Sequence, residues 1–225
     1  VVTILTDQVV ADMSEDLFLP SDYSELSDIV VPRRHNMEMP FFPANSSEID
    51  LAPNIIGEGT GVCVSPYTHT EEGYDIENME AQWAQTFRLI NKIRHHKEEI
   101  LRYEAVGLED AEVVAVAYGA TARTVKTAVL EARSQGIKAG FLRLISLWPF
   151  PDELFERNLH YLVCELNYDG QLVREVMRAA PDRKSVHFMG KSGELHTVAE
   201  VCTALDSVAK HQQMPEQAYI WTEVS

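Results

Sequence analysis

The feature that most constrains the fold is an alternation of apolar and helical segments between Asp110 and Lys210. Residues 113–117, 137–144 and 159–166 are near-continuous apolar runs of strand length, and segments with helical periodicity separate them. Strands that are buried on both faces have this unbroken apolar character, so the order predicts a mostly parallel sheet with helices on both faces. We therefore predict an α/β fold with three αβα layers around an open sheet.

The helices of this region carry recognisable start and stop signals. Thr121 is predicted as the N-cap of the first helix, and Gly136 as its end. Gly119 to Thr121 could offer backbone N–H groups to a phosphate, but the G-x-G-x-x-G spacing of a dinucleotide site is absent. Thr197 and Glu200 form a capping-box pattern ahead of the last helix.

The first hundred residues follow a different pattern. Residues 1–6 predict a short buried strand, and a strand at the very start indicates a piece of a longer polypeptide. Prolines interrupt residues 19–61, which predicts a connector rather than a compact domain. A long amphipathic helix then begins, with Asp75 as its predicted N-cap, and continues to about Arg102. Its apolar stripe comprises Ile76, Met79, Trp83, Phe87, Ile90 and Ile93. We expect this stripe to pack against a sheet or a neighbouring subunit.

Charge and cysteine content exclude several classes of function. The formal net charge of −16 argues against nucleic acid, because a phosphate backbone requires a basic surface. Cys63, Cys164 and Cys202 form no C-x-x-C pair, so we expect no zinc or iron–sulfur site held by this chain alone. No apolar run reaches the ~20 residues that cross a bilayer. We expect no membrane partner and a cytoplasmic location.

Two places in the sequence gather polar residues that could form a site. The first is residues 165–171, just past the carboxyl end of a predicted strand, where open α/β sheets contact ligands or partners. The second is the loop that holds His69 and Glu71, which could be an acid–base pair. Two neighbouring loop residues are a weak metal signal, and a local hydrogen bond of the imidazole is the simpler interpretation.

Two segments in the second half of the chain resemble a known family. Residues 147–151 read L-W-P-F-P, and residues 165–172 read E-L-N-Y-D-G-Q-L. They are similar to the L-Y-P-F-P-like and E-x-N-x-x-G-Q-L segments of 2-oxoacid:ferredoxin oxidoreductase α subunits, the 2-oxoglutarate branch above all. Residues 5–8 (L-T-D-Q) and 69–73 (H-T-E-E-G) are similar to its L-S-D-Q and H-D-E-x-G segments. Thr70 replaces an aspartate there, which weakens a catalytic role for the loop.

The resemblance implies a subunit of a thiamine-diphosphate enzyme. Such an enzyme converts a 2-oxoacid, coenzyme A and oxidised ferredoxin into an acyl-CoA, CO2 and reduced ferredoxin. Thiamine diphosphate, Mg²⁺ and an iron–sulfur cluster are then expected in the full complex and none on this fragment, which should be inactive by itself. The implied partners are a β subunit, further subunits and a homodimer contact, with ferredoxin and coenzyme A reached through the complex.

The resemblance also assigns the segments and residues. The segments are 1–18, the end of a pyrimidine-binding domain; 19–74, the connector; 75–103, the long helix; 104–211, a transketolase-C-terminal-like domain; and 212–225, a tail. The expected interface or structural residues are Trp148, Pro149, Phe150, Pro151, Glu165, Asn167, Tyr168, Gly170 and Gln171. Weak candidates are His69 and Glu71 for catalysis and Asp7 and Gln8 for a cofactor. Open alternatives are a module of another thiamine enzyme or a non-catalytic interaction domain.

Overall fold

The chain divides into two compact units, which we describe separately. We use a computed structural model that describes residues 11–16, 18–19, 21–25, 65–70 and 74–210. Residues 101–210 belong to one unit, here called the sheet unit, and residues 65–100 belong to the other, the helical unit. A 3₁₀ helix, η1 (Tyr23–Glu25), precedes residue 65 in the described part of the chain. Most of the predicted connector and all of the predicted tail beyond Lys210 lie outside the described residues.

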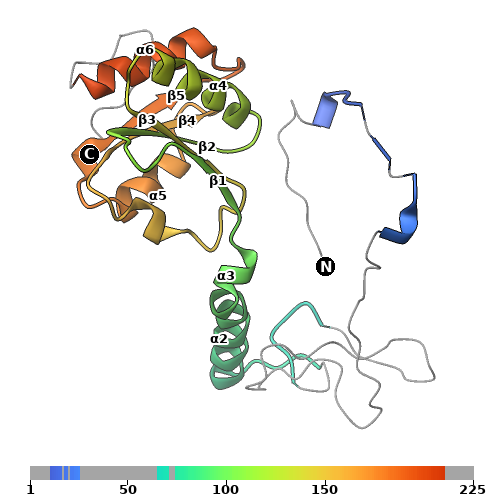
Figure 1. Ribbon diagram of the computed structural model, residues 1–225. Helices are drawn as coiled ribbons and strands as arrows, with labels where there is room; N and C mark the ends of the chain where they lie inside the picture. Colours follow the sequence, from blue (N-terminus) through green and yellow to red (C-terminus); the bar gives the residue numbers. More distant parts are fainter. Residues whose placement is uncertain (1–10, 17, 20, 26–64, 71–73, 211–225) are drawn as a thin grey trace. The chain divides into compact units, whose positions relative to one another are not determined.

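The sheet unit is built on five strands in the order β1-β3-β2-β4-β5 (Figure 1). Their bounds are β1 (Tyr103–Val106), β2 (Val113–Ala117), β3 (Ala139–Leu144), β4 (His160–Glu165) and β5 (Val186–Gly190). Strands β3, β2, β4 and β5 are mutually parallel, and β1 pairs antiparallel with β3 at the edge. The predicted mostly parallel open sheet is confirmed, and β5 forms its other edge.

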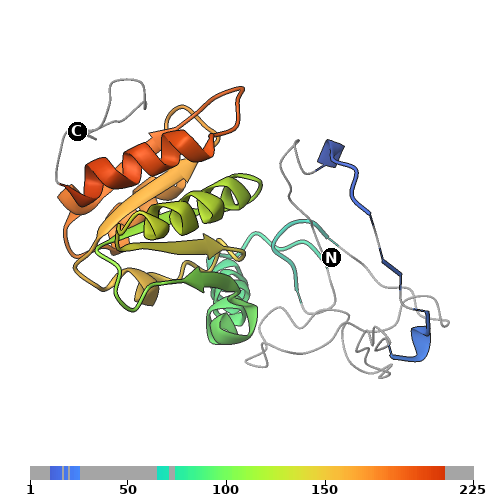
Figure 2. The ribbon, with the colours of Figure 1, turned by 45° about the horizontal axis from the view of Figure 1, so that its top comes forward.

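Helices cover both faces of this sheet, which makes the predicted three layers (Figure 2). One layer holds α4 (Thr121–Ser134) and α6 (Val198–Ala209), which pack over Ala115 and Phe141. The opposite layer holds η2 (Asp152–Phe155) and α5 (Leu172–Ala179), and a short η3 (Arg183–Ser185) leads into β5. All five residues of β2 are fully or nearly fully buried, as expected of a central strand between two layers.

The helix ends confirm some sequence predictions and correct others. Thr197 and Glu200 form the predicted capping box, with Thr197 Oγ1 accepting from the Glu200 N–H at 3.3 Å. Gly136, at φ 88°, follows the end of α4 as predicted. Thr121 as an N-cap was wrong, because Ala120 takes the N-cap position with a helical φ of −62°. Thr121 is therefore a buried residue inside the first turn.

The helical unit contains α2 (Met79–His95) and α3 (Lys97–Ile100), separated at His96. Asp75 as the N-cap of the long helix was wrong, because Asn78 caps it by accepting from the N–H groups of Glu80 and Ala81. The physical reason is that Asp75 forms an antiparallel bridge with His69, so the chain is still extended there. A helix can begin only after that bridge ends.

Candidate functional site

The polar segment after β4 is organised around one buried carboxylate. Glu165 is 0% exposed, and its carboxylate accepts the backbone N–H of Gln171, Leu172 and Val173 at 2.9–3.2 Å. Asn167 Nδ2 donates to the same carboxylate at 2.8 Å. The first N–H groups of a helix have no partner within the helix, and its N-terminus carries a partial positive charge. Glu165 satisfies these donors and places its negative charge where α5 favours it.

Two glycines allow the turn to fold over this carboxylate. Gly170 has φ 70°, a backbone conformation that residues with a side chain rarely adopt. A Cβ there would also lie only 2.5 Å from Val173 Cγ1, so there is no space for a side chain. Its N–H donates to Asn167 Oδ1. Gly190, at the end of β5, lets the carbonyl of Asn167 approach to 2.6 Å from where a Cβ would lie. The turn residues named by the sequence motif are thus brought together by the fold.

This arrangement decides what the α5 N-terminus can bind. Helix N-termini at the carboxyl ends of parallel strands are the usual place for phosphates in such sheets. Here the chain's own Glu165 occupies that place, and a second anion would meet its charge. The segment therefore acts as an internal cap, and the side chains it directs outward, chiefly Tyr168 at 59% exposed, are what it offers to other molecules.

The loop after β3 divides into a buried half and an exposed half. Phe150 is buried, stacks on Phe155 at 5.3 Å between ring centroids, and lies beneath the guanidinium of Arg178. Pro149 and Pro151 are also buried, and the Trp148–Pro149 peptide bond is cis. The proline-rich half thus anchors the loop to the α5 layer. Trp148 itself is 58% exposed.

Exposed apolar side chains follow three of the parallel strands. Because the carboxyl ends of parallel strands meet at one edge of a sheet, the segments after β3, β4 and β5 share that edge. We call the exposed set there the carboxyl-edge residues: Ile145, Leu147, Trp148, Tyr168 and Leu195. Large apolar side chains gathered on one side of a domain mark an interaction surface. The sequence pointed to Trp148 and Tyr168. Leu147 lies in the L-W-P-F-P motif but was not singled out, and Ile145 and Leu195 carry no motif.

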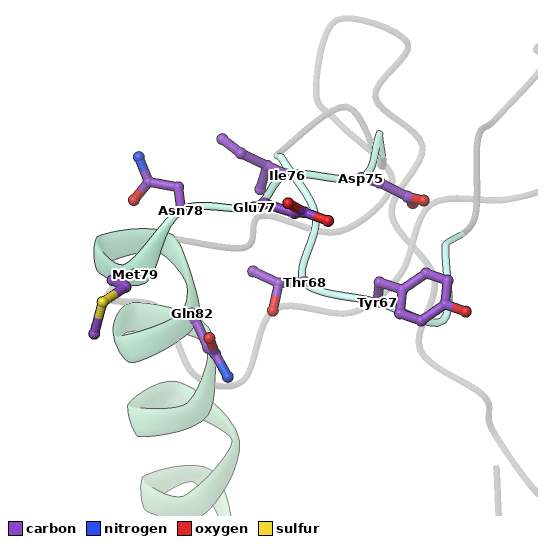
Figure 3. Close-up of a pocket in the computed structure, with 8 residues that line it drawn as sticks. All are labelled: Tyr67, Thr68, Asp75, Ile76, Glu77, Asn78, Met79 and Gln82. Carbon is purple, nitrogen blue, oxygen red and sulfur yellow. The ribbon is translucent and has the colours of Figure 1, made fainter.

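A hollow of about 480 Å³ lies beside the first turn of α2 in the helical unit (Figure 3). Its described lining residues are Tyr67, Thr68, Asp75, Ile76, Glu77, Asn78, Met79 and Gln82. Two of these carry carboxylates and none is basic, so the hollow does not fit a diphosphate or another anion. Figure 3 shows Thr68, Glu77 and Gln82 around this hollow.

The candidate His69 lies next to this hollow but is buried within its own loop. It is 8% exposed, its Nδ1 lies 2.7 Å from the carbonyl of Thr70, and its backbone N–H donates to Gln85 Oε1. This is the local hydrogen bonding expected as the simpler interpretation, and it fits a loop-positioning role. The other weak candidates, Asp7, Gln8 and Glu71, lie outside the described residues and remain predictions.

The described residues do not supply the ligands of a metal or cluster. Across residues 11–25, 65–70 and 74–210, apart from the gaps stated above, no three His, Cys, Asp or Glu side chains converge on one point. Burial raises the pKa of the Cys164 thiol to about 12, and burial also raises the pKa of Cys202. Neither thiol is then a ready thiolate ligand. No helix in this part of the chain is long and apolar enough to cross a membrane.

Sequence comparison connects the sheet unit with known enzymes. Residues 111–201 match the family described as pyruvate:ferredoxin oxidoreductase core domain II. The chain is 34% identical over 203 residues to the 2-oxoglutarate synthase subunit KorA of Methanocaldococcus jannaschii, covering 89% of this chain and 54% of that protein. It is 40% identical over 111 residues to the ketoisovalerate oxidoreductase subunit VorB of Methanothermobacter marburgensis, covering 48% and 31%.

Structural comparison gives a fold likeness to the same kind of enzyme. The 2-oxoglutarate:ferredoxin oxidoreductase from Magnetococcus marinus, solved with 2-oxoglutarate, coenzyme A and succinyl-CoA bound, superposes with a TM-score of 0.67 at 18% identity. The match covers 79% of this chain and 32% of that one. The chain spans about half the length of the KorA proteins it matches. The sequence motifs, the fold and these likenesses agree that the chain belongs to the 2-oxoacid:ferredoxin oxidoreductase α-subunit family and carries its domain II region.

Proposed function

We propose that the chain is part of the α subunit of a cytoplasmic, thiamine-diphosphate-dependent 2-oxoacid:ferredoxin oxidoreductase. The whole enzyme would convert a 2-oxoacid, coenzyme A and oxidised ferredoxin into an acyl-CoA, CO2 and reduced ferredoxin. The observation that carries this proposal is the 34% identity to a 2-oxoglutarate synthase subunit across 89% of this chain. The activity of the whole complex is inferred from that kinship.

Within such an enzyme, the sheet unit would serve assembly and the shaping of the active site. Glu165 already fills the α5 N-terminus, and the hollow beside α2 carries two carboxylates. Both observations oppose a diphosphate on the described residues, so thiamine diphosphate, Mg²⁺ and the cluster would be held by other parts of the complex. The fragment by itself would then be inactive, and calorimetry should detect no thiamine diphosphate binding to it.

The carboxyl-edge residues would face a partner, which we assign as the β subunit. Aromatic residues dominate the energy of protein interfaces, and Trp148 and Tyr168 are the two exposed aromatic members of this set. We expect Trp148→Ala and Tyr168→Ala each to weaken binding of a β-subunit homologue by about tenfold or more. Leu130→Ala is the matched control, because Leu130 is 51% exposed on α4 and lies outside the carboxyl-edge residues. Equal loss in all three variants, or no loss in the first two, would remove this assignment.

The activity is tested by reconstitution with the full-length α subunit and a β-subunit homologue. We expect reduction of ferredoxin or a viologen dye that requires a 2-oxoacid, thiamine diphosphate and coenzyme A. Absence of that reduction in a correctly assembled complex would contradict the proposed function.

The identity of the 2-oxoacid substrate is a separate question, which the two groups of relatives answer differently. The likeness to KorA covers most of this chain and favours 2-oxoglutarate, whereas the VorB likeness is 40% over half of it. We propose 2-oxoglutarate as the preferred substrate and ketoisovalerate as the second candidate. Specificity is a ratio of kcat/KM values, so both substrates should be measured on the same complex. A ratio in favour of ketoisovalerate would overturn the first choice.

A further inference from the structure

Helix α5 contacts both of the segments that carry the exposed aromatic side chains of the carboxyl edge. The turn of Tyr168 is joined to the first turn of α5 by an ion pair between Asp169 and Arg174. The loop of Trp148 is joined to the last turn of α5 by Arg178. Arg174 and Arg178 are four residues apart, so they lie on the same side of the helix, about 6 Å apart along its axis. One helix therefore supports both aromatic side chains.

Arg178 contacts the loop after β3 at two points. Its guanidinium Cζ lies 5.5 Å from the centre of the Phe150 ring, and its Nη2 lies 2.6 Å from Asp152 Oδ1. These two residues follow Trp148 by two and four positions. From within α5, Glu175 Oε2 accepts from Arg178 Nε at 2.9 Å. Because a guanidinium presents its donors in a planar fork, the two carboxylates fix its orientation over the Phe150 ring.

These contacts are too exposed to contribute much to the stability of the fold. The side chains of Arg178, Asp152 and Glu175 are each about half exposed, and ion pairs of that kind add little to the free energy of unfolding. They do restrict where the chain next to Asp152 lies. We propose that Arg178 is a positioning residue for partner recognition. It holds the loop of Trp148 on the same helix that holds the turn of Tyr168, so that the two aromatic side chains meet a partner as one preformed pair.

The positioning role rests on the proposed function, in which Trp148 and Tyr168 face a partner. Association costs conformational entropy for every loop and side chain that the complex has to order, so segments that are already fixed in the free chain bind more tightly. Without the contacts of Arg178, the loop of Trp148 would have to be ordered on binding.

The motion of Trp148 can be measured in the free chain by time-resolved fluorescence anisotropy. Trp83→Phe and Trp221→Phe leave Trp148 as the single tryptophan of the 225-residue chain. Arg178→Met, made in this parent, keeps an unbranched side chain beside Phe150 and removes the guanidinium. We expect it to reduce the residual anisotropy of Trp148, because loop and side-chain motions occur on the nanosecond timescale that the decay measures.

Arg174→Met is the matched control for the anisotropy. The Arg174 side chain lies on the same side of α5 and is 52% exposed against 51% for Arg178, but it contacts the turn of Tyr168. It should leave the decay of Trp148 unchanged. Unchanged circular dichroism and urea midpoints should show that both variants keep the fold. Equal anisotropy in Arg178→Met and its parent, or an equal decrease in Arg174→Met, would overturn the positioning role.

Binding of a β-subunit homologue measures the consequence for recognition. Arg178→Met should weaken the complex by about threefold to tenfold, which corresponds to ordering one or two further side chains on binding. The loss should disappear in the Trp148→Ala background, where the side chain that Arg178 positions is absent. The same loss in both backgrounds, or no loss in either, would count against the positioning role. Binding that Trp148→Ala leaves unchanged would remove the assigned partner contact itself, and the anisotropy separates that case from one in which Arg178 does not hold the loop.

Discussion

Among single residues, Glu165 is the one on which the local fold at the end of β4 depends. Its carboxylate accepts from three consecutive backbone N–H groups and from Asn167, with no exposure to water. Removing this acceptor would leave buried N–H donors without a partner, and each such donor lowers the free energy of unfolding by about 1–3 kcal/mol. We expect Glu165→Gln to lower the free energy of unfolding by about 2 kcal/mol, as measured by urea titration.

The matched control for this prediction lies on α5, the helix whose N-terminus Glu165 caps. Glu175 is exposed and pairs with Arg178, so Glu175→Gln should change the free energy of unfolding by no more than about 0.5 kcal/mol. If the two variants lose equal stability, Glu165 is not the cap that the geometry indicates.

His196 makes a pH-dependent contribution that the sequence did not reveal. It is 3% exposed, its Nε2 lies 3.0 Å from the carbonyl of Met189, and its Nδ1 is buried without a hydrogen-bond partner. Desolvation by burial lowers the pKa of His196. The hydrogen bond to the Met189 carbonyl and the charge of Glu200 oppose this shift, and Lys191 adds to it. The folded state therefore favours the neutral ring, and the unfolded state binds the proton first.

The sign of the pH effect follows from this difference. Stability from His196 is fully present above the ordinary pKa of 6.5 and is lost as pH falls below it. We expect the free energy of unfolding to fall less between pH 7.5 and 5 in His196→Gln than in the wild type. The pKa of Glu200 is lowered to about 2, so its own contribution is lost only at more acidic pH. Identical slopes for variant and wild type would contradict this account.

At the scale of elements, the capping box of α6 is a prediction that sequence and structure share. Thr197 Oγ1 accepts from the Glu200 N–H, and the Glu200 carboxylate accepts from the Thr197 N–H at 2.8 Å. We expect Thr197→Ala to lower the free energy of unfolding by about 1 kcal/mol. Thr203→Ala, on the exposed side of the same helix, should cost less than half as much. Equal losses in thermal or urea unfolding would show that the box contributes nothing specific.

The strands and layers could be predicted from the sequence because strands that are buried on both faces consist almost entirely of apolar residues. β2 is apolar at every position since helices cover both of its faces. Helix starts were harder, because Asp75 and Asn78 are equally good capping residues in a sequence. The bridge between His69 and Asp75 decides between these two residues, and the spacing of apolar residues gives no sign of that bridge.

The candidate site likewise combines features that the sequence predicts with features that only the structure reveals. The motif around Glu165 identified the right residues, but their role as an internal helix cap depends on the fold of a turn over six residues. Similarly, the apolar stripe of α2 was predicted from its spacing, whereas the exposure of Met79, Trp83 and Phe87 is known only from the structure. Spacing indicates which residues share a face and does not indicate what covers that face.

At the scale of the whole molecule, the sheet unit is the part to which we assign a contact with another subunit. It would meet that subunit through its carboxyl-edge residues. This contact gives the domain II region a role even though the N-terminus of α5 is closed to anions by Glu165. It can be tested without a catalytic assay.

The most direct test is amide hydrogen exchange of the chain with and without a β-subunit homologue. We expect exchange to slow at residues 145–148 and 166–169, which hold four of the carboxyl-edge residues, while exchange on the outer face of α4 around Leu130 stays unchanged. A stable complex in which those two segments exchange at the same rate as in the free chain would contradict the account.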